Sequence, residues 1–568
     1  MIRVMRPPAR LSAHPSRAGV PPWELAALLL LLALCVALRV ARLGALPIFV
    51  DESLYTRATQ IVATGPVPGT LLVMASPSYG GNPPLFSWLA APLTRLILDP
   101  LLATRLASAL IGTLGMLGTW AVGRALWGPA AALLAGLFYT LCPYLLFYNR
   151  LALLDGLVAT CGAWTLLFAI TLSRRGRVRD AAALGLCLAA ALLTKILAVD
   201  LLLLPLLAIA TAPCGRRSRA ARGAALAVAL GVLPFLVVLS MPYDNTPAAF
   251  ALHGHLQTGG GAARLVHTLQ SQAGVWETAL WLYLTPPILL LGVLGLWAAR
   301  RDRAARLVGL WAVLGSLPIV LVPNRLFVPR HFLYIAVPIL LLAARGALEL
   351  AAVTRAYRPR RAPLWPLWPV VVGLVVGLAA GPAVGADTAM IAAPARTPLI
   401  PADSFQYVRG WPSGYMLAPV IAYLRRQAAD GPVTIVAEDA NPPLYMLRIA
   451  FYRDPRITVT QGSFDTARAL HAVLRTIVPA GQLHTTYLIA HHSSDRARPA
   501  DGPGLLSRQD LLRLVLHVPS LDHASSYDVY AVGRYCSSRG WTSSPTPTTC
   551  SSSAWSSPSS SRSGASRR

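Results

Sequence analysis

The sequence predicts a mainly α-helical, polytopic membrane protein of about eleven transmembrane helices, followed by a small α/β domain outside the membrane. Three observations predict this fold. First, 55% of the 568 residues are hydrophobic and only 13% are charged, whereas a soluble globular chain carries roughly 25% charged residues. Second, long apolar segments recur between residues 22 and 385. Third, the apolar runs shorten and polar residues return over residues 386–535.

A basic tail, residues 1–21, precedes the first apolar segment, Trp23–Leu38. A basic stretch followed by an apolar one is also the pattern of a secretory signal peptide. No clear small-residue cleavage site follows, and more apolar segments come later, so we expect an uncleaved first helix. Some later segments are shorter than the ~20 residues that a straight span needs, so their ends are approximate. They are 101–123, 128–148, 157–173, 181–194, 198–213, 223–241, 276–299, 307–323, 331–350 and 364–385.

Arginine clusters between the apolar segments predict the orientation in the membrane. Four clusters fill every second connection, and Arg124 lies in the connection before them. Because cytoplasmic loops are rich in Lys and Arg, eleven spans with a cytoplasmic N-terminus place all five inside. The net charge of +27 then needs no nucleic-acid partner, and everything after about residue 386 lies outside. The clusters begin at Arg174, Arg216, Arg300 and Arg355.

The outer part of the chain, residues 386–535, alternates strand and helix patterns, which favours a small α/β domain. Residues 536–568 are rich in Ser, with Pro and Thr, and this composition cannot pack a core, so we expect a disordered tail. Within the domain we expect strands at Pro432–Ala437, Thr486–Ala490 and Tyr527–Val532, and helices at Leu417–Asp430, Asp465–Ile477 and Ser507–Val515.

Neither the cysteines nor the histidines predict a metal site. The seven cysteines form no CxxC or Cys/His pattern, and five lie in or beside apolar segments, so we expect small buried hydrophobic side chains. His253 and His255, in an outer Gly-rich loop, could bind a metal, but such a pair is more often incidental. We therefore predict no certain cofactor and leave a divalent cation open.

An acidic pair, Asp51-Glu52, stands where the first apolar segment ends. Charge next to lipid is costly, so such residues are often functional. A carboxylate here could act as a general base that takes a proton from an attacking hydroxyl, if burial tunes its pKa. It could equally cap an interfacial helix or pair with Arg39 or Arg42, and the sequence weighs these interpretations about evenly.

Further polar positions on the predicted outer side could form a site with this pair. Asn82 begins a rigid Asn-Pro-Pro turn before an aromatic-rich stretch, for which a plain interfacial helix is the simpler interpretation. Arg150 and Asp155 flank a bend and could simply pair with each other. Lys195, the only lysine in the chain, suits a phosphate as a point charge, although a snorkelling lysine is the alternative.

Arg330 and His331 complete the set of candidate residues. Lys and Arg are enriched on the cytoplasmic side, so cations on the outer side are unusual and an anionic partner is a reasonable inference. Together, the outer positions supply two acidic groups and at least two cationic groups in a cavity open to lipid. This is the chemistry of an anionic lipid-linked substrate that meets a hydroxyl or amine nucleophile. A phosphate leaves as a stable anion, and the cations would hold its developing charge.

At these residues the chain resembles the C-type glycosyltransferases that use polyprenyl-phosphate sugars. It is most similar to the family 39 group, which includes protein O-mannosyltransferases, the lipid A aminoarabinose transferase and bacterial transferases of the rhizobial core-sugar type. The similarity covers roughly residues 22–385. Its motifs are Asp51-Glu52, Asn82 to Trp88, Arg150 to Asp155, Leu193-Thr194-Lys195, Pro329 to Leu333 and, in the outer domain, Gly410 to Tyr415.

The resemblance implies a glycosyltransferase that moves a hexosyl or pentosyl group, with inversion, from a polyprenyl phosphate to a glycan, lipid or protein acceptor outside the cytoplasmic membrane. It implies that Asp51, more than Glu52, is the catalytic base, that Asp155 supports the site, and that Lys195 and Arg330 lie near the donor phosphate. This sequence departs from the family at two positions. Relatives usually carry a lysine where Asn82 stands, and an aromatic residue is common where His331 stands, so phosphate binding would depend on Arg150, Lys195 or Arg330.

Two other interpretations stay open beside the enzyme. A transporter or flippase of a lipid-linked saccharide predicts charges in mid-span and two-fold internal symmetry, and the sequence shows neither. An assembly protein that acts through residues 386–535 would not need outer-facing Asp, Lys and Arg on separate spans.

Overall fold

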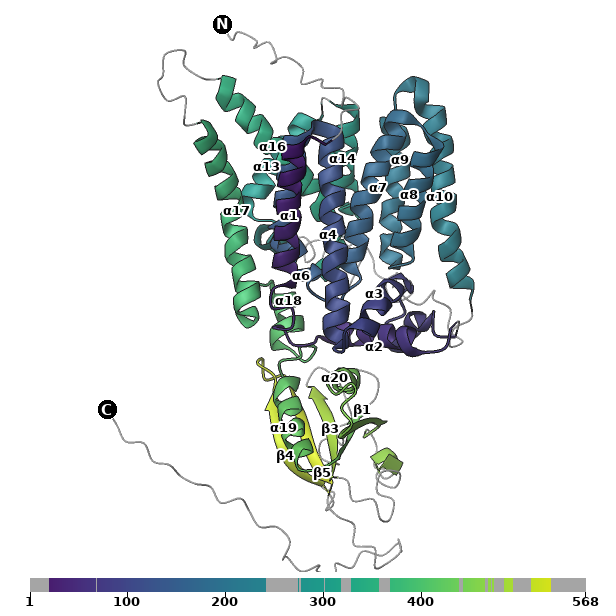
Figure 1. Cartoon of the computed structure of the whole chain (residues 1–568), viewed down its shortest axis with the longest axis vertical. Helices are drawn as coiled ribbons and strands as arrows, with labels where there is room; N and C mark the ends of the chain where they lie inside the picture. The colour runs from purple at the N-terminus through teal and green to yellow at the C-terminus, as the bar shows by residue number, and fades with distance from the viewer. Residues whose placement is uncertain are drawn as a thin grey trace, which may run out of the picture.

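The computed structural model combines a bundle of long helices with a small sheet domain at one end of the bundle (Figure 1). We call this end of the bundle the sheet-side end. A helical bundle with a small sheet-containing region near the C-terminus is the predicted fold class. The structure describes residues 20–67, 69–241, 274, 277–300, 302–317, 328–356, 368–438, 443–464, 468–470, 472–473, 485–493 and 512–532.

Within the described residues, each expected apolar segment contains a helix or a pair of helices. Five helices of the described chain are long and apolar enough to cross a membrane, or up to seven if each of two bent pairs counts as one span. The pairs bend by 59° between α5 and α6, and by 103° between Glu277–Tyr283 and α13. The prediction of a polytopic helical fold is confirmed. The bundle consists of α1 (Pro22–Val40), α4 (Pro100–Trp127), α5 (Pro129–Thr140), α6 (Pro143–Asn149), α7 (Asp155–Arg175), α8 (Val178–Leu192), α9 (Leu203–Thr211), α10 (Arg217–Ser240), α13 (Pro286–Ala299), α14 (Arg303–Leu314), α16 (Ala336–Ala356) and α17 (Trp368–Ala392).

Small residues allow some of these helices to approach closely. A Cβ added at Gly295 of α13 would lie 1.8 Å from the carbonyl oxygen of Leu342, and one added at Gly346 of α16 would lie 2.0 Å from that of Leu291. Such close backbone packing is how helices associate where no water drives them together. The α13–α16 pair is therefore held by glycine at both sides of the contact.

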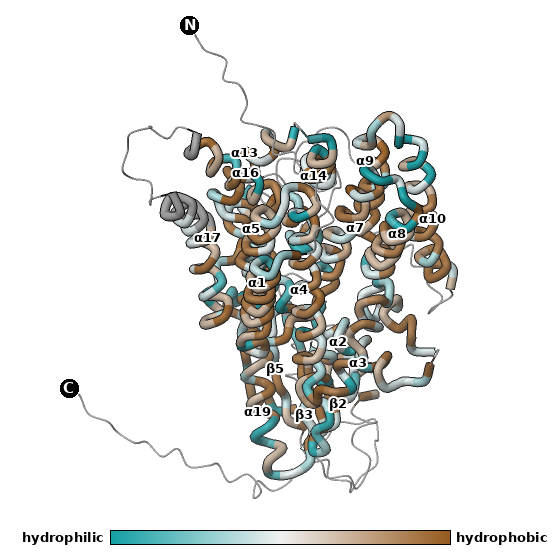
Figure 2. Tube along the Cα trace, turned by 45° about the horizontal axis from the view of Figure 1, so that its top comes forward, coloured by the Kyte–Doolittle hydropathy of each residue, from teal (hydrophilic) through white to brown (hydrophobic). Residues whose placement is uncertain are grey.

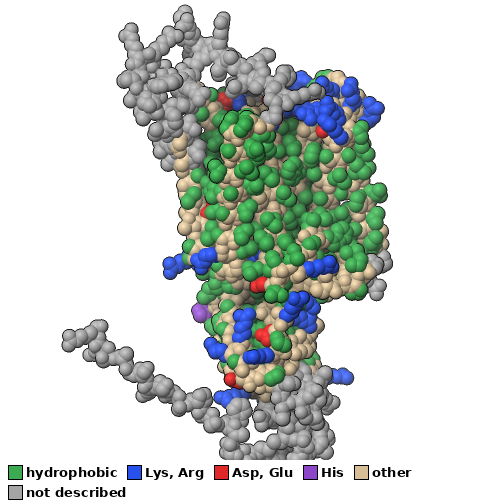
Figure 3. Space-filling model, viewed as in Figure 1, with side chains coloured by type: hydrophobic (Ala, Val, Ile, Leu, Met, Phe, Trp, Pro, Cys, Tyr) green, Lys and Arg blue, Asp and Glu red, His purple; other side chains and the backbone are tan. Residues whose placement is uncertain are grey.

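The surface of the bundle is that of a membrane protein. On the face seen in Figure 3, hydrophobic side chains cover a broad band of the bundle, and Lys and Arg side chains gather at the end opposite the sheet domain, over the connection between α9 and α10. The hydropathy along the trace shows the same apolar helices (Figure 2). Two helices, α2 (Val50–Thr64) and α3 (Leu85–Leu96), instead lie across the sheet-side end (Figure 1). The acidic pair thus begins a helix that does not cross the bundle.

The sheet domain has five strands in the order β2-β1-β3-β5-β4. Strand β1 is parallel to β2 and β3, and β5 is antiparallel to β3 and β4. The expected strands at residues 432, 486 and 527 and the expected helix at Leu417 are all confirmed. The elements are α19 (Leu417–Ala429), β1 (Val433–Glu438), α20 (Leu444–Ala450), β2 (Ile457–Gly462), β3 (Thr485–Ser493), β4 (Leu512–Pro519) and β5 (Ser525–Val532).

One helix prediction in this domain is wrong. Ser507–Val515 was expected to be helical, but strand β4 begins at Leu512 and pairs with β5 along its length, with an irregularity between Leu514 and Leu516. A short apolar run does not distinguish a helix from a strand, and here pairing with β5 decides the conformation. Other expectations lie largely or wholly outside the described residues: the helix at 465–477, the His253–His255 pair, the basic tail and the Ser-rich tail.

Candidate active site at the sheet-side end

Four charged side chains meet at the sheet-side end of the bundle, although they come from four separate segments. Asp51, in the first turn of α2, forms an ion pair with Arg330. The Nε of Arg330 lies 3.7 Å from Oδ2 of Asp155, and the Nζ of Lys195 donates to Oδ1 of Asp155 at 2.7 Å. We call these four residues the charged cluster. All four were predicted site residues.

Exposure distinguishes Asp51 from the other three members of the charged cluster. Its side chain is 27% exposed, whereas the side chains of Arg330, Lys195 and Asp155 are 8%, 10% and 4% exposed. Asp155 lies in the first turn of α7, where the helix dipole favours a negative charge. Asp155 is therefore the buried acid that contacts both cations. Asp51 is the more accessible acid of the charged cluster.

The sequence motifs around the charged cluster contact one another. The backbone N–H of Leu85 donates to the carbonyl of Leu193 at 3.0 Å, which joins the Asn-Pro-Pro stretch to the segment that carries Lys195. The Asn82 side chain donates to the carbonyl of Gly80 at 2.8 Å and hydrogen-bonds Tyr55, which lies one turn after Asp51. Asn82 thus stabilises its own loop beside the cluster and forms no ion pair.

Glu52 has surroundings quite unlike those of Asp51. It is fully buried and accepts two hydrogen bonds from Arg105, at 2.6 and 2.8 Å. It also accepts the backbone N–H of Ala152 at 2.8 Å and that of Phe49 at 3.2 Å. With both oxygens occupied, Glu52 joins α2 to α4 and to the loop before α7.

Arg105 was not singled out in the sequence, yet it organises the turn that leads into α2. Besides Glu52, its guanidinium donates to the carbonyls of Leu43, Leu46 and Pro47, at 2.9, 2.7 and 3.2 Å. The available signal was an arginine just inside an apolar segment, a position where charge is costly. Its partners are mostly backbone carbonyls, which no sequence pattern identifies.

Arg150 binds the end of α1, and His331 follows Arg330 in the chain. Arg150 donates to the carbonyls of Leu38, Arg39 and Arg42, at 2.6, 3.2 and 3.4 Å, at the C-terminal end of α1. A cation in this place satisfies free carbonyls and the negative end of the helix dipole. His331 follows Arg330 in the same turn, Pro329–Ile335, and is half-buried.

Two aromatic side chains lie against Arg330: Phe49, just before α2, and Tyr407, between α17 and the sheet domain. The hydroxyl of Tyr407 accepts a hydrogen bond from Nη1 of Arg330 at 3.0 Å, and the guanidinium lies 5.2 Å from the ring centroid of Phe49. The Phe49 and Tyr407 rings are 4.7 Å apart. Neither residue was predicted, although Tyr407 lies only three residues before the Gly410 motif.

The Gly410 to Tyr415 motif positions the start of α2. The N–H of Val50 donates to the carbonyl of Pro412 at 3.1 Å. Gly414 lies so close to this segment that an added Cβ would be 2.2 Å from the carbonyl oxygen of Ile48. Only glycine fits there, so the motif fixes the backbone immediately before Asp51.

Beyond Tyr407 lies a buried acid, Asp403, in α18 (Pro401–Ser404). It is fully buried, and its Oδ2 accepts hydrogen bonds from Tyr148, at 2.5 Å, and from Tyr283. Burial raises the pKa of Asp403 to about 6, although the two tyrosine hydrogen bonds and the nearby Arg330 act in the opposite direction. This carboxyl therefore titrates near neutral pH.

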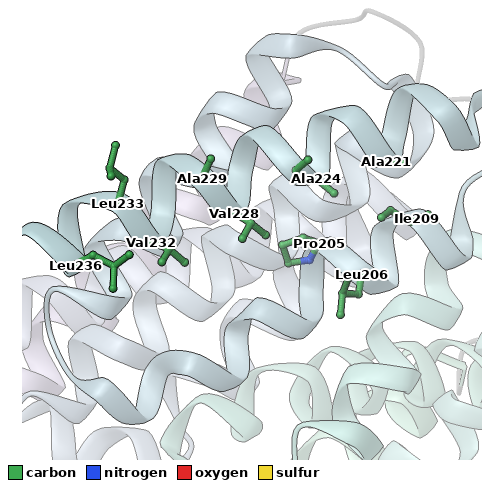
Figure 4. A pocket seen from close by; sticks show the side chains of 11 residues that line it. Pro205, Leu206, Ile209, Ala221, Ala224, Val228, Ala229, Val232, Leu233 and Leu236 are labelled. Atoms are coloured by element: carbon green, nitrogen blue, oxygen red, sulfur yellow. The ribbon is translucent and has the colours of Figure 1, made fainter. Parts of the chain in front are cut away.

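Other features of the described chain lie away from the charged cluster. An apolar groove between α9 and α10 is lined by residues such as Pro205, Val228 and Leu236 (Figure 4). Within the described residues, no group of three or more His, Cys, Asp or Glu side chains could hold a metal ion. The charged cluster differs from these features in bringing two carboxylates and two cations together.

Comparisons with known proteins agree with the fold of the bundle and the sheet domain. Residues 81–241 match the dolichyl-phosphate-mannose-protein mannosyltransferase family. The structure is similar to that of ArnT from Cupriavidus metallidurans in the apo state, with a TM-score of 0.54 and 16% identity over 89% of this chain and 97% of that chain. ArnT from the same organism bound to undecaprenyl phosphate gives the same score and identity and is covered to 98%.

A more distant structural relative shares the fold. The archaeal oligosaccharyltransferase AglB from Archaeoglobus fulgidus, in complex with an inhibitory peptide and a dolichol-phosphate, matches with a TM-score of 0.51 and 12% identity, over 82% of this chain and 69% of that chain. No curated protein matches the sequence. At these identities the structural likeness establishes the fold, and the reaction has to be argued from the site.

Proposed function

We propose that this chain, which has the fold of the C-type glycosyltransferases, transfers a sugar from a polyprenyl-phosphate donor to an acceptor at the sheet-side end. The observation that carries the proposal is the charged cluster, in which the accessible Asp51 contacts Arg330 while Asp155 holds both Arg330 and Lys195. A base beside two cations suits a reaction in which a hydroxyl loses a proton and a phosphate leaves.

In this reaction Asp51 removes the proton from the acceptor hydroxyl. The acceptor oxygen attacks the anomeric carbon, and the bond from that carbon to the phosphate oxygen breaks, so that the configuration is inverted. The lipid phosphate departs with the electron pair, as an anion that needs no proton. Asp51 is suited to the role because it is the most exposed carboxylate of the charged cluster.

Lys195 and Arg330 bind the donor phosphate in this proposal. Both are largely buried, so their charges act in a medium of low dielectric, where an anion gains more than in water. Arg330 is paired with Asp51 in the structure, and donor binding exchanges this carboxylate for phosphate oxygens. The exchange frees Asp51 to accept a proton. Asp155 orients both cations throughout.

The other predicted site residues take lesser roles. Glu52 is saturated by Arg105 and two backbone N–H groups, so it positions α2 and does not react. Arg150 is engaged at the end of α1 and is assigned no phosphate contact. Asn82 and His331 remain candidates for contacts to the donor.

The outer face of the cytoplasmic membrane is the proposed location of the reaction. The arginine-rich connection between α9 and α10 lies at the end of the bundle opposite the sheet domain (Figure 3). Since Lys and Arg mark the cytoplasmic side, the charged cluster and the sheet domain face outward. The acceptor is then a glycan, a lipid or a protein of the cell envelope.

The test of this proposal removes the base and measures transfer. In a strain that lacks the protein, mass spectrometry of polyprenyl-phosphate sugars and envelope glycans identifies a donor that accumulates and a glycan that loses a sugar. We expect Asp51→Asn to leave both defects uncorrected, with a loss of rate of about 100-fold or more. Glu349→Gln, which removes a surface carboxylate of α16, is the matched control and restores both. Full restoration by Asp51→Asn would sink the proposal.

A further inference from the structure

Asp403 lies in α18, between α17 and the sheet domain, and it hydrogen-bonds two separate helices of the bundle. Its Oδ2 accepts hydrogen bonds from Tyr148 of α6 and from Tyr283, which ends the helix before α13. Each of the three side chains is at most 1% exposed. A buried carboxylate is costly unless hydrogen bonds compensate it, so this acid is stable here only while both hydroxyls point at it.

The turn that carries Asp403 also carries Tyr407. The two residues are four positions apart, which places them one turn apart on the continuous helical segment from Pro401 to Arg409. The ring of Tyr407 packs against that of Tyr148, with centroids 6.1 Å apart. Fixing Asp403 between its two tyrosines therefore also fixes the position of Tyr407.

Arg330 is held from two directions by this group of tyrosines. The Tyr407 hydroxyl accepts a hydrogen bond from its guanidinium at 3.0 Å. Tyr144, whose ring stacks on that of Tyr283 at 5.3 Å, donates to the carbonyl of Pro329, immediately before Arg330 in the chain. Both the backbone and the head group of Arg330 thus depend on side chains that pack around Asp403.

We propose that Asp403, clamped by Tyr148 and Tyr283, is a positioning residue that holds Tyr407 against Arg330 and so keeps the guanidinium in place for the donor phosphate. The inference rests on the proposed function and adds to it a link between the sheet-domain side and phosphate binding. Asp403 touches no reacting atom, and it acts through Tyr407.

The test compares donor and acceptor kinetics in purified full-length protein. We expect Asp403→Asn and Tyr407→Phe each to raise the KM for the lipid-phosphate donor by about tenfold, the scale of one hydrogen bond to a charged group, while the acceptor KM stays the same. Tyr487→Phe is the matched control, because it also removes a buried tyrosine hydrogen bond, to Gln427 at 2.8 Å in the sheet domain. It should leave the donor KM unchanged.

A double-mutant cycle separates positioning from simple loss of stability. If Asp403 acts through Tyr407, the double variant is no worse than the worse single variant, whereas independent lesions multiply. Additive effects, or equal changes in the donor and acceptor KM, would overturn the inference. Should Asp403→Asn fail to fold, Tyr148→Phe and Tyr407→Phe decide the question in the same way.

The pH profile supplies a second readout. The groups that face Asp403 are the hydroxyls of Tyr148 and Tyr283 and, at longer range, Tyr144, Tyr407 and Arg330. None of these titrates between pH 5 and 7 in its ordinary range. As the pH falls through about 6, Asp403 becomes protonated and loses its charge. The hydrogen bonds that its Oδ2 accepts from the two tyrosines are then weaker, and the donor KM rises. This inflection should vanish in Asp403→Asn. If Asp51→Asn is inactive while the profile of Asp403→Asn matches the wild type, the inference fails and the proposed function stands.

Discussion

The adjacent residues Asp51 and Glu52 differ in exposure and in their partners. Both start α2, but successive helical positions point about 100° apart. Asp51 reaches the cluster with Arg330, whereas Glu52 turns into the protein toward Arg105. One carboxylate is accessible and has a single close cation, and the other is buried and accepts four hydrogen bonds.

This contrast predicts that Glu52 matters for stability more than for chemistry. Glu52→Gln leaves the buried Arg105 without its counter-charge, and breaking such a pair costs about 3–5 kcal/mol. We expect a clear fall in the thermal unfolding temperature of the detergent-purified protein, while Asp51→Asn unfolds like the wild type. Glu349→Gln, in a partly exposed pair, serves as control. A wild-type unfolding curve for Glu52→Gln would contradict the structural role.

Lys195 is expected to act on donor binding. Lys195→Met removes one of the two cations assigned to the phosphate and leaves Asp155 with only Arg330, at 3.7 Å. The donor KM should rise about tenfold or more, because a charge-assisted hydrogen bond is lost, and the acceptor KM should not change. Arg345→Met, which removes a cation from α16 away from the cluster, is the control. Equal behaviour of the two variants would argue against a phosphate contact.

At the scale of elements, the catalytic geometry depends on how α2 is anchored at its first turn. The loop at Pro412 to Gly414 supports the backbone before Asp51, and Glu52 ties the same turn to α4. Neither contact involves a group that reacts. The position of the proposed base is therefore set by three segments that are distant in sequence.

Gly414→Ala tests this anchoring. The added methyl group would meet the carbonyl oxygen of Ile48 at 2.2 Å, so the segment before α2 has to shift. Because small displacements of a catalytic group reduce the rate strongly, we expect kcat to fall about tenfold or more with little change in membrane insertion. Gly215→Ala, where an added Cβ meets nothing within 4 Å, should have normal kcat. Normal kcat in Gly414→Ala would mean that the loop does not position Asp51.

The sequence predicted the members of the charged cluster better than the residues that support them. Charge at the end of an apolar segment is rare and costly, so Asp51, Asp155, Lys195 and Arg330 could be recognised before their contacts were known. Tyr407 and Asp403 could not, because they lie in the outer part of the chain, where lipid imposes no such constraint. Strand β4 was mistaken for a helix because its conformation depends on pairing with β5.

At the scale of the whole molecule, the charge distribution makes a topological prediction. Cys214 is exposed and lies in the arginine-rich connection between α9 and α10, whereas Leu521 is exposed at the sheet-domain end. With Cys536 and Cys550 replaced by serine, an impermeant maleimide should label Cys214 only after the cells are permeabilised. A Leu521→Cys variant should be labelled in intact cells. The reverse pattern would place the charged cluster on the cytoplasmic side.

The bond between Glu52 and Arg105 also bears on how the protein is made. The two residues are 53 positions apart, and Ala152, the third partner, follows Glu52 by 100. At roughly 5–20 residues per second of synthesis, Glu52 reaches the membrane several seconds before Arg105 exists. During that interval Glu52 lacks its counter-charge. The helix that bears the proposed base can therefore reach its final position only after α4 and the segment that carries Ala152 have been made.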